Sequence, residues 1–377
     1  MSESPAHDHP RRLALLFRNL LHCGFFGPAL PPLQTMVVRL RMPKRIVEDA
    51  LALLHKDGLV ELNAGQYRRI YPESAKGAGA PTAVRPRIAI LTERNIFGHY
   101  FEVYQDYFIG VAELAEASGL DIVFAHDLAT TEAKIIALEE MVRAGVKGVA
   151  VLGRAEAEFR AGLKASGLPT VICGNASIEQ RDFGCICSDN IFGTKNLVNY
   201  LIKRGHRAIG YYVTAAHSHD GYHHRLLGYR DAMAEAGLAA NERMVLDECH
   251  SASSSGTAVE IFTALPPRER PSAIVCGCDR DAFELISELE KSGVKVPRDV
   301  SVAGFENSLF NTFSEPALTT VDIFPREMGR VAGGFLATEL KSRQLPARIV
   351  LPSKLIQRDS VLSPGASASP APVSTLL

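Results

Sequence analysis

The first seventy residues carry apolar positions at helical spacing, followed by a short alternating stretch. Apolar residues at 13, 16, 17, 20 and 21 give one apolar face to the segment 11–23, as expected for an amphipathic helix. Pro43 suits the first turn of a helix, where a missing N–H costs nothing. The pattern predicts three helices and a hairpin, at 11–23, 32–40, 44–56, and 59–62 with 67–71.

From residue 87 onward the pattern changes to apolar runs that alternate with helical stretches. Continuous apolar runs are typical of parallel strands covered on both faces, and the helices between them supply the crossovers. Residues 72–86 are small, rich in Gly and Pro and non-periodic, which predicts a linker; residues 362–377 have the composition of a disordered tail. Strands are expected at 87–91, 121–125, 148–152, 170–173, 208–213, 273–276 and 300–305, with helices at 100–118 and 131–143.

The charge is distributed unevenly along the chain. Residues 1–87 hold 13 Lys and Arg against 7 Asp and Glu, whereas the remainder holds 28 against 35. A basic small domain joined to an acidic larger one favours phosphate binding by the first only. The amino terminus lacks the apolar run of a secretory signal, and the seven cysteines sit mostly in apolar runs. We therefore expect a cytoplasmic protein with buried free thiols and no membrane segment.

The segment 30–62 resembles the GntR-type winged helix-turn-helix. It keeps that family's leading Leu-Pro, its core positions and its Gly-Leu-Val turn without a gap, at Leu30, Pro31, Leu40, Val47, Ala50, Leu51, Leu54, Gly58, Leu59 and Val60. Further core positions are expected at Leu13, Leu16, Phe17, Leu20, Leu33 and Val37. The resemblance implies a DNA-binding domain over residues 1–71.

The DNA contacts that the resemblance implies are less faithful to the family. Lys44 and Arg45 lie where a recognition helix presents its first residues to the major groove; the alternative is that they only form a solvated helix start. Gln34 stands where the family usually has Arg, and Glu48 where it often has Arg. Arg68, on the expected wing, can reach phosphate or the minor groove. The expected DNA contacts are Gln34, Lys44, Arg45 and Arg68.

Several segments between 188 and 361 resemble the effector domain of the lactose/galactose repressor family. They include SDNIFGTKNLVNYLIKRGHRAIGYY (188–212), RLLGYRDAMAEAGL (225–238) and IVLPSKLIQRDSV (349–361). The combination with a GntR-type head is similar to arabinose-responsive repressors. The implied fold is α/β: two doubly wound lobes over 87–361, of the periplasmic-binding-protein type, with an effector between them. Chain crossings are expected near 188–190, 304–310 and 322–325.

Three residues of the second lobe match effector-binding positions of that family. Arg225 matches an arginine whose planar fork suits adjacent sugar hydroxyls, and Glu306 matches an acidic residue able to accept two hydroxyl hydrogen bonds. Asp279 either contacts the ligand or caps the helix that begins there. From the first lobe, Arg94, Tyr100 and Phe101 follow the first strand and are expected to line the cleft, although the two aromatics could equally belong to the core.

The sequence offers little catalytic or metal-binding chemistry. HSHDGYHHR (217–225) gathers four histidines, but metal binding there is a minor alternative to a place at the rim of the cleft, and no cofactor is expected. Phosphate-loop, nucleophile-elbow and dinucleotide motifs are absent. The leading hypothesis is a non-enzymatic, ligand-responsive DNA-binding regulator, a dimeric repressor that binds operator DNA and a sugar-like effector. The alternatives are a solute-binding protein or a sugar-modifying enzyme on the same fold.

Overall fold

The computed structural model describes most of the chain and divides it into two compact units. Described are residues 9–22, 30–40, 42–63, 65–70, 85–93, 101–126, 128–174, 181–214, 220–240, 242–246, 254–308, 311, 315–342 and 346–365. The first unit comprises residues 1–187 and 325–350, and the second comprises 188–324 and 351–377. The chain thus passes between units at 187/188, 324/325 and 350/351. The third passage differs from the one expected at 304–310, a segment that lies inside the second unit.

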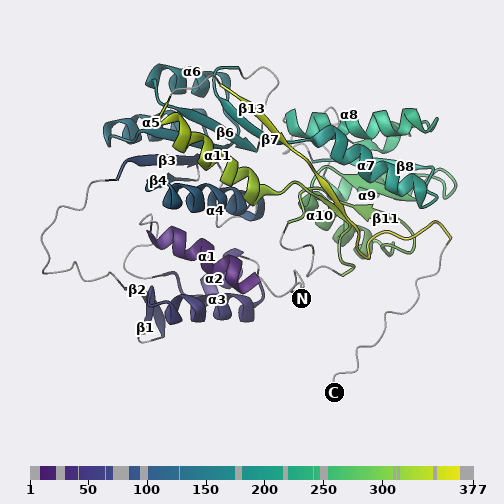
Figure 1. Ribbon diagram of the computed structural model, residues 1–377. Helices are drawn as coiled ribbons and strands as arrows, with labels where there is room; N and C mark the ends of the chain where they lie inside the picture. Colours follow the sequence, from purple (N-terminus) through teal and green to yellow (C-terminus); the bar gives the residue numbers. More distant parts are fainter. Residues whose placement is uncertain are drawn as a thin grey trace, which may run out of the picture. The chain divides into compact units, whose positions relative to one another are not determined.

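The amino-terminal part of the first unit consists of three helices and an antiparallel hairpin (Figure 1). Of the expected core residues, Leu13, Phe17, Val47, Ala50, Leu51 and Leu54 are buried, Leu33 and Val37 are half-buried, and the side chains of Leu16 and Leu20 lie outside the described residues. The apolar face of each helix is therefore what holds this part together. Its elements are α1 (His9–His22), α2 (Leu33–Leu40), α3 (Lys44–Lys56), β1 (Val60–Asn63) and β2 (Gln66–Arg69).

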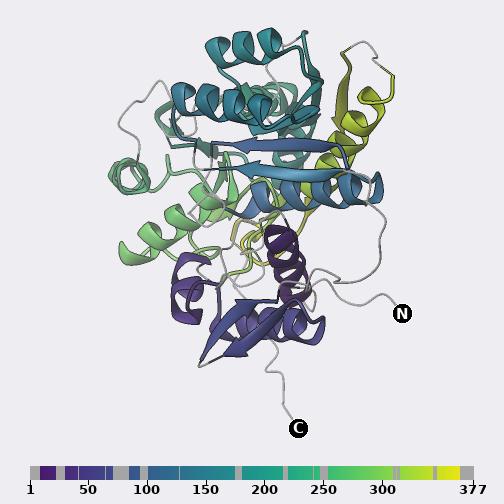
Figure 2. The same cartoon turned by 90° about the vertical axis from the view of Figure 1, so that its left-hand side faces the viewer.

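The rest of the first unit is a six-stranded sheet in the order β13-β7-β6-β5-β3-β4. From β4 through β3, β5 and β6 to β7 all neighbours are parallel. Figure 2 shows the blue strands β3 and β4 side by side with helices on both faces. The elements are β3 (Arg87–Thr92), α4 (Phe101–Ala117), β4 (Asp121–Ala125), α5 (Thr131–Arg143), β5 (Gly148–Gly153), α6 (Ala157–Ser166), β6 (Thr170–Gly174), β7 (Gly184–Ser188), α11 (Pro325–Glu339) and β13 (Arg348–Leu351).

Two helices of this unit, α4 and α11, pack with their backbones in direct contact. A Cβ atom added to Gly110 of α4 would lie 2.0 Å from the carbonyl oxygen of Arg326, and one added to Gly329 of α11 would lie 2.1 Å from that of Tyr107. Only glycine permits so close an approach. Segments separated by more than 200 residues are joined in this way into one layer of the unit.

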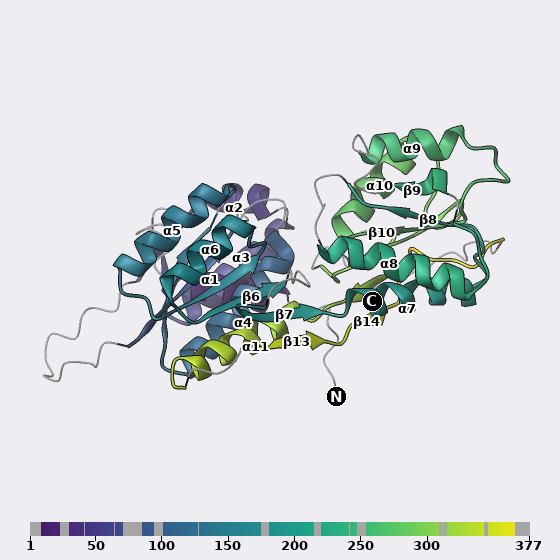
Figure 3. The ribbon, with the colours of Figure 1, turned by 90° about the horizontal axis from the view of Figure 1, so that it is seen from above.

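The second unit is built on a four-stranded parallel sheet in the order β11-β10-β8-β9. Figure 3 shows α7 and α8 on one side of β8 and β10, and α9 and α10 on the other. A small antiparallel pair, β12 with β14, completes it. The elements are α7 (Asn190–Lys203), β8 (Ile209–Tyr212), α8 (Asp220–Glu235), a short 3₁₀ helix (Glu242–Met244), β9 (Val245–Leu246), α9 (Ser255–Ala264), β10 (Ala273–Cys276), α10 (Asp279–Lys291), β11 (Ser301–Ala303), β12 (Thr320–Asp322) and β14 (Lys354–Ile356).

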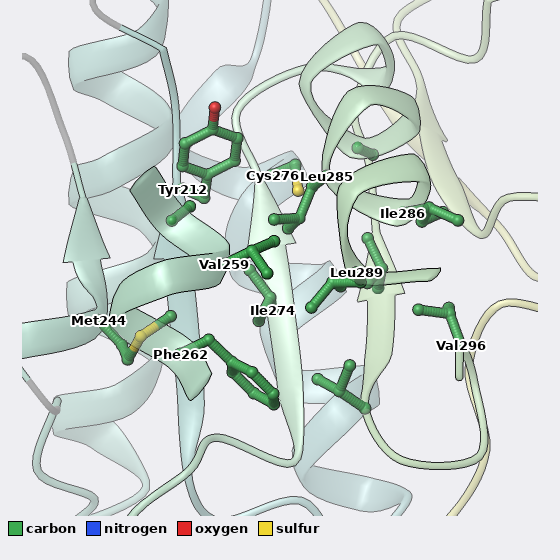
Figure 4. Close-up of a cluster of buried hydrophobic side chains, with 14 of the residues drawn as sticks. Tyr212, Met244, Val259, Phe262, Ile274, Cys276, Leu285, Ile286, Leu289 and Val296 are labelled. Atoms are coloured by element: carbon green, nitrogen blue, oxygen red, sulfur yellow. The ribbon is translucent and has the colours of Figure 1, made fainter. Parts of the chain in front are cut away.

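One large apolar core fills the space between this sheet and the helices α9 and α10. Phe262, Ile274, Leu285 and Leu289 are at most 3% exposed, and Figure 4 shows their side chains converging from α9, β10 and α10. Burial of these side chains ties the sheet to its covering helices. The strands therefore hold the loops at their carboxyl ends in defined positions.

The described residues include the main α/β elements expected from the sequence, while some of its other predictions lie outside them. Most of the expected linker, 72–84 of 72–86, and residues 366–377 of the expected tail fall outside the described residues. The five described cysteines, at 173, 185, 187, 276 and 278, are buried and free, as expected. Among the helices that the structure describes, none has the length and apolar character to cross a membrane.

Candidate functional site

The polar residues of the second unit gather at the carboxyl ends of its parallel strands. Arg225 lies on α8, which follows β8; Asp279 follows β10; and Glu306 follows β11. Because parallel strands end at one edge of their sheet, loops far apart in sequence meet there. In open α/β sheets this edge is where ligands bind.

Arg225 connects several of the residues at this edge. It is 5% exposed, and its Nη1 donates to Glu306 Oε1 at 2.9 Å and to the Gly277 carbonyl at 2.6 Å. Its Nε donates to Asn190 Oδ1 at 3.0 Å. Burial by itself lowers the pKa of Arg225, but Glu306, together with Tyr222 and Cys278, outweighs burial and raises that pKa above its ordinary value. The guanidinium is therefore a permanent cation in a fixed orientation.

The guanidinium group of Arg225 packs against two aromatic rings. Its central carbon lies 4.2 Å from the ring centroid of Phe305 and 4.8 Å from that of Tyr222. Such stacking limits the arginine to one plane. Sequence reasoning singled out Arg225 but missed Asn190, Tyr222 and Phe305, although Asn190 and Tyr222 lie in quoted segments and Phe305 directly precedes Glu306. Only their convergence in space distinguishes them from core residues.

Glu306 occupies a backbone conformation that L residues rarely adopt. Its φ is 107° and that of the following Asn307 is 54°. Such conformations cost on the order of 1–3 kcal/mol each and persist only where the surroundings enforce them. Here the Glu306 N–H donates to the Val321 carbonyl at 2.7 Å, which anchors the loop to β12. Its side chain is 20% exposed, so the carboxylate that faces Arg225 still reaches solvent.

Asp279 does not cap α10, which was one of the two roles expected for it; its contact with a ligand stays a prediction. It is fully buried, and its Oδ2 accepts from the Ser308 N–H at 2.6 Å and from the Asn311 amide at 2.7 Å, while Oδ1 accepts from the Thr320 hydroxyl. The residue before α10 is Cys278, and no side-chain bond caps this helix. Asp279 thus neither caps α10 nor has an oxygen atom left without a hydrogen bond; it secures the loop that presents Glu306.

Burial dominates the electrostatics of Asp279. Desolvation raises its pKa from an ordinary 3.8 to about 7, although the hydrogen bonds from Thr320, Ser308 and Asn311 lower it. The hydrogen-bond donors that hold this carboxylate are neutral, so they offset its desolvation only in part. The loop that carries Glu306 therefore depends on a group that titrates near neutral pH.

Three residues of the first unit were expected to line the cleft. Arg94 and Tyr100 lie outside the described residues, as does the side chain of Phe101, whose backbone begins α4. What the structure adds at this edge is a buried ion cluster. Lys134 of α5 is 2% exposed, and its Nζ donates to Glu93 Oε2 at 3.1 Å and Glu156 Oε2 at 2.9 Å. Lys134 thus joins the loops that follow β3 and β5.

The histidine-rich segment does not assemble a metal site among the described residues. His217 and His219 lie outside them, while His223 and His224 lie on α8. No group of three or more His, Cys, Asp or Glu residues in the described part of the chain could hold a metal ion. Burial raises the pKa of the Cys276 and Cys278 thiols well above their ordinary value, so these thiols stay protonated and are poor metal ligands.

The expected DNA-contacting residues are spread over α2, α3 and β2. Gln34 and Arg68 are exposed, and Arg68 stands opposite Glu61 in the hairpin. The side chains of Lys44 and Arg45 are 62% and 92% exposed. They begin α3 and extend outward from its buried face.

Comparisons with known proteins find matches mainly in the carboxy-terminal half of the chain. A family model described as periplasmic binding protein-like domain matches residues 198–361. The chain is 34% identical over 167 residues to the HTH-type transcriptional repressor PurR of Vibrio campbellii, covering 43% of this chain and 48% of that protein. It is 32% identical over 208 residues to the HTH-type transcriptional regulator GalR of Escherichia coli, covering 54% and 58%. The chain thus spans about half the length of the curated relatives it matches.

Solved structures share the fold of this chain over a larger part of its length. The transcription regulator CcpA of Lactococcus lactis matches with a TM-score of 0.65 and 22% identity, over 74% of this chain and 100% of its own. A complex of the transcriptional regulator CelR with cellobiose matches with a TM-score of 0.65 and 21% identity, over 88% and 100%. Sequence, topology and comparisons agree that this chain has an α/β fold with parallel sheets and contains a periplasmic-binding-protein-like domain.

Proposed function

We propose that this protein is a ligand-responsive DNA-binding transcription regulator, a repressor of genes for carbohydrate use that acts as a homodimer. The observation that carries the proposal is the Arg225–Glu306 pair at the carboxyl edge of a sheet, in which helix α8 supplies Arg225 and a strained loop supplies Glu306. The same chain also has a basic helical head. The curated relatives support the regulatory role, because their names describe transcriptional repressors and regulators.

The chemistry of the Arg225 site favours a neutral polyhydroxylated effector. A guanidinium donates hydrogen bonds and a carboxylate accepts them, so together they suit neighbouring hydroxyl groups that do both. Phe305 and Tyr222 already flank the arginine, so its orientation is set before the effector arrives. The effector changes DNA affinity by binding one conformation of the protein better than another.

The head is proposed as a winged helix-turn-helix of the GntR type. The support is local: α2 and α3 are separated by a short turn, and an antiparallel hairpin follows α3 directly. A recognition helix followed by a wing is the arrangement that the sequence resemblance implies. Gln34, Lys44, Arg45 and Arg68 are its proposed DNA contacts, at base edges for α3 and at phosphates for the wing.

Selection of genomic DNA fragments on the purified full chain, with and without a pool of monosaccharides, tests this function. We expect one palindromic site to be enriched and one sugar to change its recovery at least tenfold. Arg225→Lys should bind the same site but respond weakly to the sugar, because a lysine lacks the planar fork. Failure to enrich any fragment would overturn the regulator assignment and favour a solute-binding protein. A site that no sugar affects would overturn the effector class alone.

A further inference from the structure

The exposed face of α3 carries acidic as well as basic side chains. Val47, Ala50, Leu51 and Leu54 are buried, so the outward face of its first two turns consists of Lys44, Arg45, Glu48 and Asp49. Lys44 Nζ lies 3.4 Å from Glu48 Oε1, and Arg45 Nε lies 3.9 Å from Asp49 Oδ2. The first half of the proposed recognition helix therefore has no net charge.

This neutrality is unexpected for a helix that only grips phosphates. A phosphate-binding surface gains affinity from each cation, whereas Glu48 and Asp49, 47% and 53% exposed, are repelled by the DNA backbone. Exposed ion pairs of this kind contribute little to stability, so folding does not require the acids. Their position on the outward face points to a role at the bases.

The major-groove edge of a G·C base pair complements such a pair of side chains. Guanine presents two acceptors, N7 and O6, which Lys or Arg can bind, and cytosine presents an amino donor, which Glu or Asp accepts. Residues four apart on a helix lie about 5–6 Å from each other. A basic residue and an acidic residue one turn later can therefore meet the two halves of one G·C pair.

We propose that Glu48 and Asp49 determine operator specificity by accepting hydrogen bonds from cytosine amino groups, with Lys44 and Arg45 on the paired guanines. The inference rests on the proposed DNA-binding function and names its partner: half-sites with two G·C pairs under the start of α3. The pairs Lys44–Glu48 and Arg45–Asp49 open on binding, and each side chain exchanges its partner for a base.

The test is selection from a randomised double-stranded library with the full chain and with Glu48→Gln. The wild type should select G·C at adjacent half-site positions. Because glutamine binds adenine rather than cytosine, Glu48→Gln should replace that cytosine by adenine. One position of each half-site should therefore shift from G·C toward T·A, with a change in relative preference of about tenfold. A second variant, Lys44→Glu with Glu48→Lys, should reverse the orientation of that base pair to C·G.

Glu139→Gln is the matched control. Glu139 forms an exposed pair with Arg143 four residues later on α5, at 3.7 Å, so the substitution removes the same charge from the same kind of pair without touching α3. It should leave the selected site unchanged.

Three results would overturn the inference in distinguishable ways. If Glu48→Gln strengthens binding to all sequences equally, Glu48 only repels phosphate and does not read a base. If the wild type selects a site without G·C pairs that respond to position 48, the assignment is wrong while the regulator function stands. If the wild type selects no site, the proposed function fails first, and the specificity assignment fails with it.

Discussion

The ion pairs of α3 and the Arg225–Glu306 pair have similar chemistry and opposite environments. Lys44 and Glu48 are 62% and 47% exposed, whereas Arg225 and Glu306 are 6% and 20% exposed at the side chain. Water competes for the first pair, and opening it costs little. The second pair is enclosed by aromatic rings and fixed hydrogen bonds, so its geometry exists before any ligand arrives. Exposure thus separates an ion pair that can open easily from one whose geometry is fixed by its surroundings.

The largest effect is expected when one partner of the buried pair is removed. Arg225→Met leaves the Glu306 carboxylate and the Gly277 carbonyl oxygen without the donor that they share, so the free energy of unfolding should fall by about 3 kcal/mol. Urea denaturation would measure it. Adding Glu306→Gln should recover part of the loss. An equal or greater loss in the double variant would mean that packing, not charge, holds the site.

Lys134 extends the comparison to the first unit. Lys134→Met removes the cation that Glu93 and Glu156 share and leaves the two carboxylates facing each other. We expect the free energy of unfolding to fall by about 2–3 kcal/mol. Lys164→Met is the control, because Lys164 forms an exposed pair with Asp182 at 3.0 Å; its loss should stay below about 0.5 kcal/mol. Equal losses in both variants would contradict the role given to burial.

Asp279 tests what burial does to a carboxylate whose hydrogen-bond donors are all neutral. Its pKa is raised from 3.8 to about 7. Between these two pH values the folded protein therefore keeps a proton that the unfolded chain has already released. Stability should therefore fall as pH rises through this window, by about 2 kcal/mol between pH 5 and pH 7 from this group. Asp279→Asn, which does not titrate, should lack that component in urea unfolding at the two pH values. The same pH dependence in variant and wild type would show that Asp279 does not cause this loss of stability.

The smallest effect on stability is expected at the exposed pair. Glu48→Gln should change the free energy of unfolding by less than about 0.5 kcal/mol, while its expected effect on base preference is about tenfold. Thermal unfolding of the same preparations used for selection would compare the two. A destabilisation as large as that of Arg225→Met would show that Glu48 serves the fold and not recognition.

Local patterns predicted the regular elements well. The helices Lys44–Lys56 and Thr131–Arg143 and the strands Asp121–Ala125 and Ala273–Cys276 begin and end where the sequence indicated. An amphipathic face or an unbroken apolar run is written into a short stretch of chain, and its burial requires only that some partner surface exists. The basic charge of the first 87 residues was also apparent from the sequence, and the roles of Arg225 and Glu306 in effector binding stay predictions.

The strands β12, β13 and β14 were harder to predict, since they are only three or four residues long. Strands β12 and β14 pair across more than thirty residues, and β13 is mostly exposed. Their pairing depends on neighbours that a local pattern does not contain. For the same reason the third passage between the units falls at 350/351 and not at 304–310.

The sequence by itself determined which residues could form helices and strands, where the charge lies, and which side chains are candidates for DNA contacts and for effector binding. The tertiary structure alone decided that Asp279 supports a loop, that Asn190 and Phe305 join Arg225, and that Lys134 is buried between two carboxylates. The physical reason is distance along the chain: burial and hydrogen bonding act between residues that meet only when parallel strands bring their carboxyl ends to one edge.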